Sequence, residues 1–160
     1  MSTRPPVPLE KLSPMLRLYV QLKEERPDTL LFMRVGDFFE AYGEDAELMA
    51  RELEITLTGR DIQGLEKRYP MAGVPHHALE RYMARLVQKG YKVAICDQIE
   101  DPKQAKGLVK RAVTRVVTPG TLVEDALLDA RSNNYLLAVI LKTPTFGLGI
   151  VDVSTGEFLV

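Results

Sequence analysis

The stretch TLLFMRVGDFFEAY, which runs from Thr29 to Tyr42, decides the fold of this chain. Its first half, Thr29 to Val35, is almost continuously apolar, and this pattern predicts a β-strand with both faces covered by other elements. Gly36-Asp37 then marks a turn or a bulge, after which Phe38 to Tyr42 resumes an extended pattern. The sequence therefore predicts two strands with a sharp interruption between them.

Helical periodicity flanks this stretch on both sides. Ser13-Pro14 predicts a helix start, with the serine as N-cap and the proline at the first helical position, and Pro27 ends that helix. A second helix is expected from about Gly43, and a third from Pro75 to Gly90. The apolar stripes of the three helices are Met15, Leu18, Tyr19 and Leu22; Ala46, Met49, Ala50 and Leu53; and Leu79, Tyr82, Met83 and Leu86.

The remaining elements follow from short apolar runs and turn residues. The expected elements are strands at Ile55–Thr58, Tyr91–Ile99 and Val109–Val117, loops at Gly59–Pro70 and Glu100–Leu108, a short helix at Glu124–Arg131, and strands at Tyr135–Leu141, Gly147–Val153 and Glu157–Val160. The mixture of strands and helices predicts an α/β fold with a mixed sheet and helices packed around it.

Three regions follow from this order. We expect a flexible N-terminus over residues 1–12, an α/β domain over 13–129, and the start of a second domain over 130–160. A meander of three strands is unable to bury a face by itself, so the last region predicts a domain whose remaining elements are missing.

Composition restricts the class of protein. The 160 residues hold a single cysteine, Cys96, so no internal disulfide forms, and a reducing, intracellular compartment is the default. No apolar run approaches the length of a membrane helix, and the first residues lack the pattern of a secretory signal. Lys and Arg total 21 against 22 Asp and Glu, a net charge of −1 that argues mildly against DNA binding. The distribution is uneven, however: Asp37–Glu54 is rich in acids, and Pro102–Thr118 has none.

Several short motifs carry a family resemblance. The run Met33-Arg34-Val35-Gly36-Asp37-Phe38-Phe39-Glu40 resembles the motif at which the MutS family of DNA mismatch-repair proteins probes DNA. Further landmarks follow in the family's order: Ser13-Pro14-Met15 before a helix with Tyr19, Pro70 to Pro75 followed by His77-Ala78, Val93 to Ile99, and Val116 to Thr121. The resemblance covers nearly the whole chain from Ser13. It implies a mismatch-recognition domain followed by a connector domain that resembles a ribonuclease H fold.

The resemblance implies an aromatic wedge followed two residues later by a glutamate, here Phe38 and Glu40. In an extended segment residues i and i+2 point to the same side, so both reach one site while Phe39 and Ala41 point to the core. An aromatic ring that enters the minor groove unstacks a weakened step and kinks the duplex. A mismatch is then recognised by its low deformation cost rather than by its sequence. By pattern alone, the two phenylalanines are simply core residues and Glu40 is an edge-strand charge.

The glutamate has a selective use in this scheme. A carboxylate near phosphates is repelled, so Glu40 contributes no general affinity. It accepts a hydrogen bond from an exposed base edge or, if protonated, donates one to a purine ring nitrogen. We hypothesise that phosphates and burial favour the protonated form in the complex.

Four basic residues are expected to contact DNA. Arg60 resembles a basic position near the family's backbone contacts, and the acid-free stretch supplies Lys110, Arg111 and Arg115. Such contacts position a protein on DNA without specifying sequence. Gly59 departs from the lysine that is common before the family's arginine, and this departure puts the local contact set in doubt.

The resemblance also implies partners and cofactors. The expected DNA partner is a duplex with a mismatch or a small insertion or deletion loop. A full-length family protein forms a dimer, engages MutL and the sliding clamp, and uses ATP and magnesium. This chain lacks the phosphate-loop motif Gly-x-x-x-x-Gly-Lys-Ser/Thr, so we expect no enzymatic activity, no ATP site and no metal in this segment, and a cytoplasmic, nucleoid-associated location in bacteria.

Two other classes stay open. Several carboxylates suggest a magnesium-dependent nuclease site: Asp37, Glu40, Asp97, Glu100 and Asp101. The chain is alternatively a protein-interaction module without a role in reading DNA. The adjacent His76 and His77 have poor geometry for holding one metal ion together, and Cys96 lies in an apolar strand where a small core residue fits.

Overall fold

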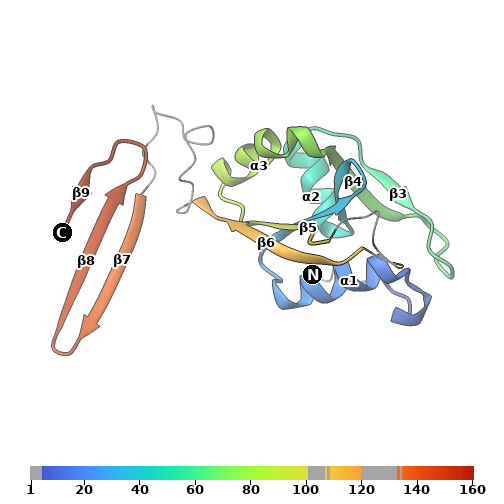
Figure 1. Cartoon of the computed structure of the whole chain (residues 1–160), viewed down its shortest axis with the longest axis horizontal. Coiled ribbons are helices and arrows are strands. Elements are labelled where there is room, and N and C mark those ends of the chain that lie inside the picture. The colour runs from blue at the N-terminus through green and yellow to red at the C-terminus, as the bar shows by residue number, and fades with distance from the viewer. Residues whose placement is uncertain (1–4, 101–106, 108, 120–132, 134) are drawn as a thin grey trace. The chain divides into compact units, whose positions relative to one another are not determined.

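Strands β1 (Leu30–Val35) and β2 (Phe38–Tyr42) form an antiparallel hairpin at the centre of a six-stranded sheet in the computed structural model of the chain (Figure 1). The structure describes residues 5–100, 107, 109–119, 133 and 135–160. These residues form two units, Met1–Val116 and Val117–Val160. The two strands predicted from the central stretch are confirmed, and the interruption at Gly36 is a tight turn between them.

The sheet has the strand order β3-β4-β2-β1-β5-β6. Its other strands are β3 (Thr58–Arg60), β4 (Tyr69–Pro75), β5 (Val93–Gln98) and β6 (Arg111–Val117). Strands β2 and β3 both pair antiparallel with β4, whereas β1 and β5 are parallel. The α/β class with a mixed sheet is therefore confirmed.

Helices cover both faces of this sheet. The helix α1 (Pro14–Glu25) lies on one face, and α2 (Glu44–Leu53) and α3 (Leu79–Gln88) lie on the other (Figure 1). The helix α1 begins as predicted, because the Ser13 hydroxyl accepts a hydrogen bond from the Leu16 amide at 3.3 Å. Its buried residues are Met15, Leu16, Tyr19 and Val20, so the buried stripe is shifted slightly from the predicted one.

The alternation of side chains in the strands divides the core between the two faces. Leu31 and Met33 in β1 pack with the α1 side chains, together with Tyr42 from β2 and Cys96 from β5. The intervening side chains, such as Phe32, are equally buried. The expectation that the first central strand is covered on both faces is confirmed.

Two predictions around β3 and β4 are wrong. The strand expected at Ile55–Thr58 lies at Thr58–Arg60, because Glu54 adopts a left-handed conformation (φ 58°) and the Ile55 amide still donates to the Ala50 carbonyl at 3.1 Å. The region expected as a loop, Gly59–Pro70, has strand at both ends. The strand β4 was not predicted, since its prolines and its glycine are residues that strands usually avoid.

Smaller differences concern the third helix and the N-terminus. Residues His76–Ala78 form a 3-10 turn, so α3 starts at Leu79 rather than Pro75, and Gly90 follows its end with a φ of 92°. The expected flexibility of residues 1–12 stays a prediction; Val7 and Leu12 are buried and belong to the core cluster that includes the α1 side chains.

The second unit is a three-stranded antiparallel sheet of β7 (Tyr135–Lys142), β8 (Thr145–Asp152) and β9 (Phe158–Leu159). Its strands agree with the predicted ones and fit the expected start of a connector domain. Many of its apolar side chains are exposed, including Ile140, Leu141 and Phe146. The helix expected at Glu124–Arg131 and most of the loop expected at Glu100–Leu108 lie outside the described residues.

A buried hydrogen-bond network joins α1 to the strands and to α2. The Asp45 carboxylate accepts from the Tyr19 hydroxyl at 3.0 Å and from the Leu31 amide at 3.0 Å. The Lys23 ammonium group lies 2.8 Å from the other carboxylate oxygen of Asp45. The Tyr19 hydroxyl also accepts from the Tyr42 amide at 3.2 Å. The Asp45 carboxylate thus connects α1, β1 and α2.

Replacing Asp45 by alanine removes the acceptor for these donors and leaves the Lys23 charge buried. We expect Asp45→Ala to lower the free energy of unfolding by about 3 kcal/mol, as removal of one partner from a buried ion pair does. The measurement is urea unfolding followed by circular dichroism. The matched control is Asp28→Ala, whose carboxylate pairs with Lys92 at 2.6 Å but lies on the surface, so little change is expected there. Equal effects of the two changes would contradict the assigned role of Asp45.

Candidate nucleic-acid interface

The two adjacent phenylalanines of β2 lie in opposite environments. Phe38 is 46% exposed, whereas Phe39 is 3% exposed and Ala41 is fully buried. The prediction that Phe39 and Ala41 point to the core is confirmed. Phe38 is the first residue after the β1–β2 turn, so the chain presents an aromatic ring to solvent at the turn end of the hairpin.

The turn before Phe38 is fixed by its backbone. Gly36 has a φ of 57°, a left-handed conformation that glycine adopts without steric cost. The Asp37 carbonyl accepts a hydrogen bond from the His76 amide at 2.8 Å, which ties the turn to the end of β4. The Arg34 guanidinium lies 5.5 Å from the centre of the Phe39 ring and also donates to the Gly36 carbonyl. These contacts tie the hairpin end to β4 and to the Arg34 side chain.

Glu40 lies on the same side of β2 as Phe38, which agrees with the expected spacing. Its Oε2 accepts a hydrogen bond from the Tyr42 hydroxyl. The Tyr42 hydroxyl in turn accepts from the Arg60 Nη1 at 3.2 Å. Burial raises the pKa of Tyr42, and the Glu40 carboxylate raises this pKa further, so the hydroxyl keeps its proton. The structure therefore joins Glu40 and Arg60 through a buried tyrosine.

Two glycines on neighbouring strands lie close to this arrangement. Gly73 is paired with Glu40 across β2 and β4, and a Cβ atom on it would lie 3.4 Å from the Glu40 Cγ and 3.8 Å from the Phe38 Cδ1. At Gly59 a Cβ atom would lie 2.6 Å from the Cβ of Arg68, so a side chain there requires the backbone to shift. This contact accounts physically for glycine, rather than lysine, before Arg60.

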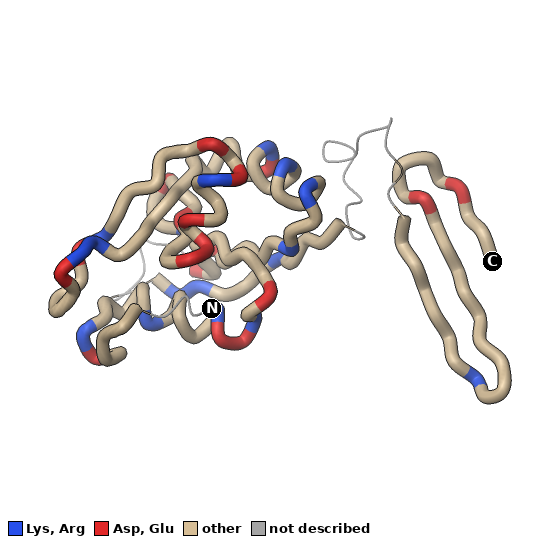
Figure 2. Tube along the Cα trace, turned by 180° about the vertical axis from the view of Figure 1, so that it is seen from behind, with Lys and Arg blue, Asp and Glu red and all other residues tan. Residues whose placement is uncertain are grey.

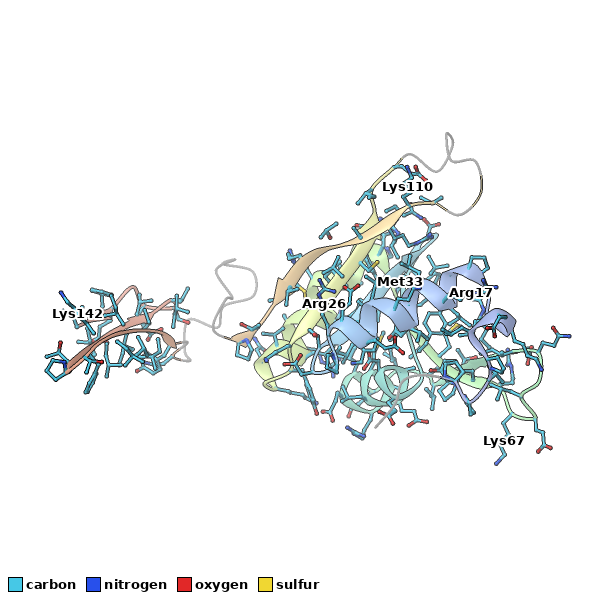
Figure 3. The ribbon with its side chains drawn as sticks, turned by 90° about the horizontal axis from the view of Figure 1, so that it is seen from below. Arg17, Arg26, Met33, Lys67, Lys110 and Lys142 are labelled. Atoms are coloured by element: carbon cyan, nitrogen blue, oxygen red, sulfur yellow. The ribbon has the colours of Figure 1, made fainter. Side chains whose placement is uncertain are left out.

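The predicted cations just before and at the start of β6 have different surroundings. The Lys110 side chain is largely exposed, and its ammonium group lies 4.0 Å from a Glu100 oxygen. The Arg111 guanidinium donates to the carbonyls of Arg34 and Val109, each at 2.7 Å. Arg111 therefore ties β6 to the end of β1. Figure 3 shows Lys110 at one margin of the face that α1 covers.

Arg115 contacts a different part of the fold from Lys110 and Arg111. Its guanidinium binds both oxygens of the Glu80 carboxylate, at 3.0 and 2.8 Å, and so joins β6 to α3. A phosphate at Arg115 would have to compete with this carboxylate. Among the predicted residues, the contacts thus join Glu40 with Arg60 beside Phe38, place Arg111 at the end of β1, and tie Arg115 to α3.

Sequence reasoning missed three residues that shape this region. Arg34 stacks on Phe39, Tyr42 carries the contact between Glu40 and Arg60, and Gly73 places no side chain against the glutamate. Tyr42 shares the i, i+2 spacing with Glu40, which was a usable signal. The role of Gly73 depends on the strand β4, which was not predicted.

The acidic stretch is explained by α2. Glu44, Asp45 and Glu47 lie in its first turn, where carboxylates interact favourably with the positive end of the helix dipole. The helix α2 covers the face of the sheet opposite to the one that α1 covers (Figure 1), so these acids belong mainly to the α2 face. Most charged positions lie in the first unit, and the strands of the second unit are nearly all neutral (Figure 2).

Other kinds of site find little support in the part of the chain that is described. No group of three or more His, Cys, Asp and Glu side chains there could hold a metal ion. Asp101, which belonged to the carboxylate set of the nuclease alternative, lies outside that part. No helix among the described residues is long and apolar enough to cross a membrane. Cys96 is a fully buried core residue, as predicted, and burial raises the pKa of its thiol to about 11.

Comparisons with known proteins agree with the motifs. A family model for MutS domain I matches residues 13–126. The DNA mismatch repair protein MutS of Symbiobacterium thermophilum is 62% identical over 148 residues, covering 92% of this chain and 17% of the relative. The protein of the same name from Acaryochloris marina is 56% identical over 156 residues, covering 98% of this chain and 18% of the relative. That from Methanothrix thermoacetophila is 54% identical over 149 residues, with 93% and 17% covered. The chain thus spans less than a fifth of these relatives' length.

The difference in burial between Phe38 and Phe39 should appear as a difference in the free energy of unfolding of their alanine variants. Phe39→Ala empties a packed site, and we expect it to lower the free energy of unfolding by about 3–5 kcal/mol. Phe38→Ala removes a half-exposed ring, and we expect a change within about 0.5 kcal/mol. Chemical denaturation of both variants gives the comparison. A large loss for Phe38→Ala would show that the ring contributes to folding rather than being free for a partner.

Proposed function

Since the chain belongs to the MutS family and carries its domain I, we propose that it reads duplex DNA for mispaired or unpaired bases, with Phe38 as the inserted side chain. The single observation that supports this role most is the environment of Phe38. The ring is 46% exposed at the end of the β1–β2 hairpin, directly beside the buried Phe39, so it is accessible to a partner.

The insertion is favourable where the duplex is already weakened. Opening a base step costs stacking energy, and a mispaired or unpaired base has less of it to lose. The Phe38 ring then stacks on the exposed base, which restores on the order of 1–3 kcal/mol. Because the turn at Gly36 and Asp37 is held by hydrogen bonds, little conformational entropy is lost when the ring is inserted. The discrimination comes from the difference in deformation cost between matched and mismatched DNA.

Glu40 supplies the second contact in this proposal. It lies on the Phe38 side of β2, so a base displaced by the ring comes within reach of its carboxylate. An oxygen of Glu40 accepts from the base edge, or the protonated group donates to a ring nitrogen. Phosphates repel the carboxylate wherever no such contact forms, so Glu40 lowers the affinity for matched duplex more than the affinity for mismatched duplex.

The basic residues position the protein on the backbone. Lys110 is the most accessible of the predicted cations, and Arg60 and Arg111 lie on β3 and β6, the two edge strands of the sheet. Within this segment we propose binding without catalysis and without a bound cofactor. Dimerisation, engagement of MutL and the sliding clamp, and the use of ATP and magnesium belong, in this proposal, to a full-length MutS protein that carries the chain.

The first test removes the ring. In a full-length MutS protein carrying this chain, we expect Phe38→Ala to lower the affinity for a duplex with one unpaired thymine by about 10- to 100-fold, and to change the affinity for matched duplex little. Fluorescence anisotropy titrations on both duplexes measure the ratio of the affinity for the unpaired-thymine duplex to that for the matched duplex. Val116→Ala is the control, because Val116 is also 46% exposed but lies on β6. Retained discrimination in Phe38→Ala would instead favour a protein-interaction module.

The second test concerns phosphate contacts. Each neutralised phosphate contributes about one unit to the slope of log affinity against log salt, so Lys110→Ala should reduce that slope by about 1 on any duplex. The control is Lys92→Ala, which removes an exposed lysine directly before β5 that pairs with Asp28. Arg115→Ala shows whether an arginine already bound to Glu80 also contacts DNA. An unchanged slope for Lys110→Ala would exclude that residue from the interface.

A further inference from the structure

The contact between Glu40 and Tyr42 fixes the orientation of the glutamate. The Tyr42 ring is fully buried, and it packs edge-on against Tyr19 with 4.9 Å between ring centroids and 79° between the ring planes. The Tyr42 amide donates to the Tyr19 hydroxyl at 3.2 Å, so backbone and ring are both held. A hydroxyl on such a fixed ring offers Glu40 Oε2 a single position to occupy.

The direction of the hydrogen bonds follows from the donors present. A guanidinium only donates, so Arg60 Nη1 supplies the proton in its contact with the Tyr42 oxygen. The tyrosine's own proton is then directed to Glu40 Oε2, since the competing acceptor, Met15 Sδ, is a weak one at 3.9 Å. The chain of contacts therefore runs from Arg60 through Tyr42 to Glu40.

This arrangement gives the two oxygens of the Glu40 carboxylate different surroundings. Oε2 is occupied by Tyr42, and no hydrogen bond from the described residues reaches Oε1. Gly73, opposite Glu40 on β4, places no side chain against the glutamate. Arg60 also places a positive charge near the site without an ion pair to the carboxylate, so its other nitrogens remain able to donate.

We propose that Tyr42 and Arg60 are positioning residues for Glu40, which hold one carboxylate oxygen so that the other is presented to the base exposed beside Phe38. The inference rests on the proposed reading of DNA and assigns a second role to Arg60 besides a backbone contact. A carboxylate that is already oriented loses little rotational freedom when it meets the base, so the pair increases discrimination rather than general affinity.

The test is a double-mutant cycle in a full-length MutS protein carrying this chain. We expect Tyr42→Phe, which keeps the ring and removes only the hydroxyl, to lower the ratio of mismatched to matched affinity about tenfold, the equivalent of one hydrogen bond to a charged group. In the Glu40→Ala background the same change should leave the ratio unaltered. Tyr91→Phe, which removes a hydroxyl near Arg51 and Glu52, is the matched control.

A second variant keeps the test independent of core packing. Arg60→Lys retains the charge on β3 but replaces the guanidinium, and we expect a loss of discrimination that again disappears in the Glu40→Ala background. A loss of equal size with and without the Glu40 carboxylate would mean a structural role only, and would overturn the proposal.

Phe38→Ala, measured alongside, separates this proposal from the one on which it rests. If Phe38→Ala abolishes discrimination while the Tyr42 and Arg60 variants show no coupling to Glu40, only the positioning role is wrong. If Phe38→Ala retains discrimination, the proposed reading of DNA fails, and the positioning role fails with it.

Discussion

The Tyr19 hydroxyl group is the point at which the first unit is held together. It lies within hydrogen-bond distance of the Leu31 carbonyl and the Asp45 carboxylate, and it accepts from the Tyr42 amide. A helix, both central strands and the following helix therefore meet at one buried oxygen. Because the group is buried, each unmade hydrogen bond would cost the full desolvation of its partner, so the network permits only one relative placement of these elements.

The candidate site inherits its geometry from that network. Tyr42 is fixed by Tyr19 at its amide and at its ring, and its hydroxyl reaches Glu40, two residues earlier on the same side of the strand. A buried polar network thus extends to the residue that is proposed to contact a base. The exposed ring of Phe38 has a separate support, the tight turn at Gly36, so the two proposed contacts depend on different parts of the core.

The sequence predicted the parts of this structure that depend on local periodicity and capping. The strands around Gly36 and the N-cap at Ser13 follow from such rules. The inward orientation of Phe39 follows from side-chain alternation once the family resemblance places Phe38 outward. The strand β4 was not predicted, because its prolines and glycine have low strand propensity and its pairing with β2 and β3 is a tertiary contact that local rules do not show. The contacts of Arg111 and Arg115 were equally inaccessible, since their partners lie 77 and 35 residues away in the chain.

The length of the β1–β2 turn has a consequence for how this segment tolerates insertions and deletions. Side chains alternate between the faces of a strand, so a shift of β2 by one residue exchanges the positions of Phe38 and Phe39. The shifted strand would still bury one phenylalanine and expose the other, so the number of buried phenylalanines would not change. The glutamate, however, would turn into the core. A one-residue indel at Gly36-Asp37 is therefore more damaging than most single substitutions nearby, even though the turn itself contacts solvent.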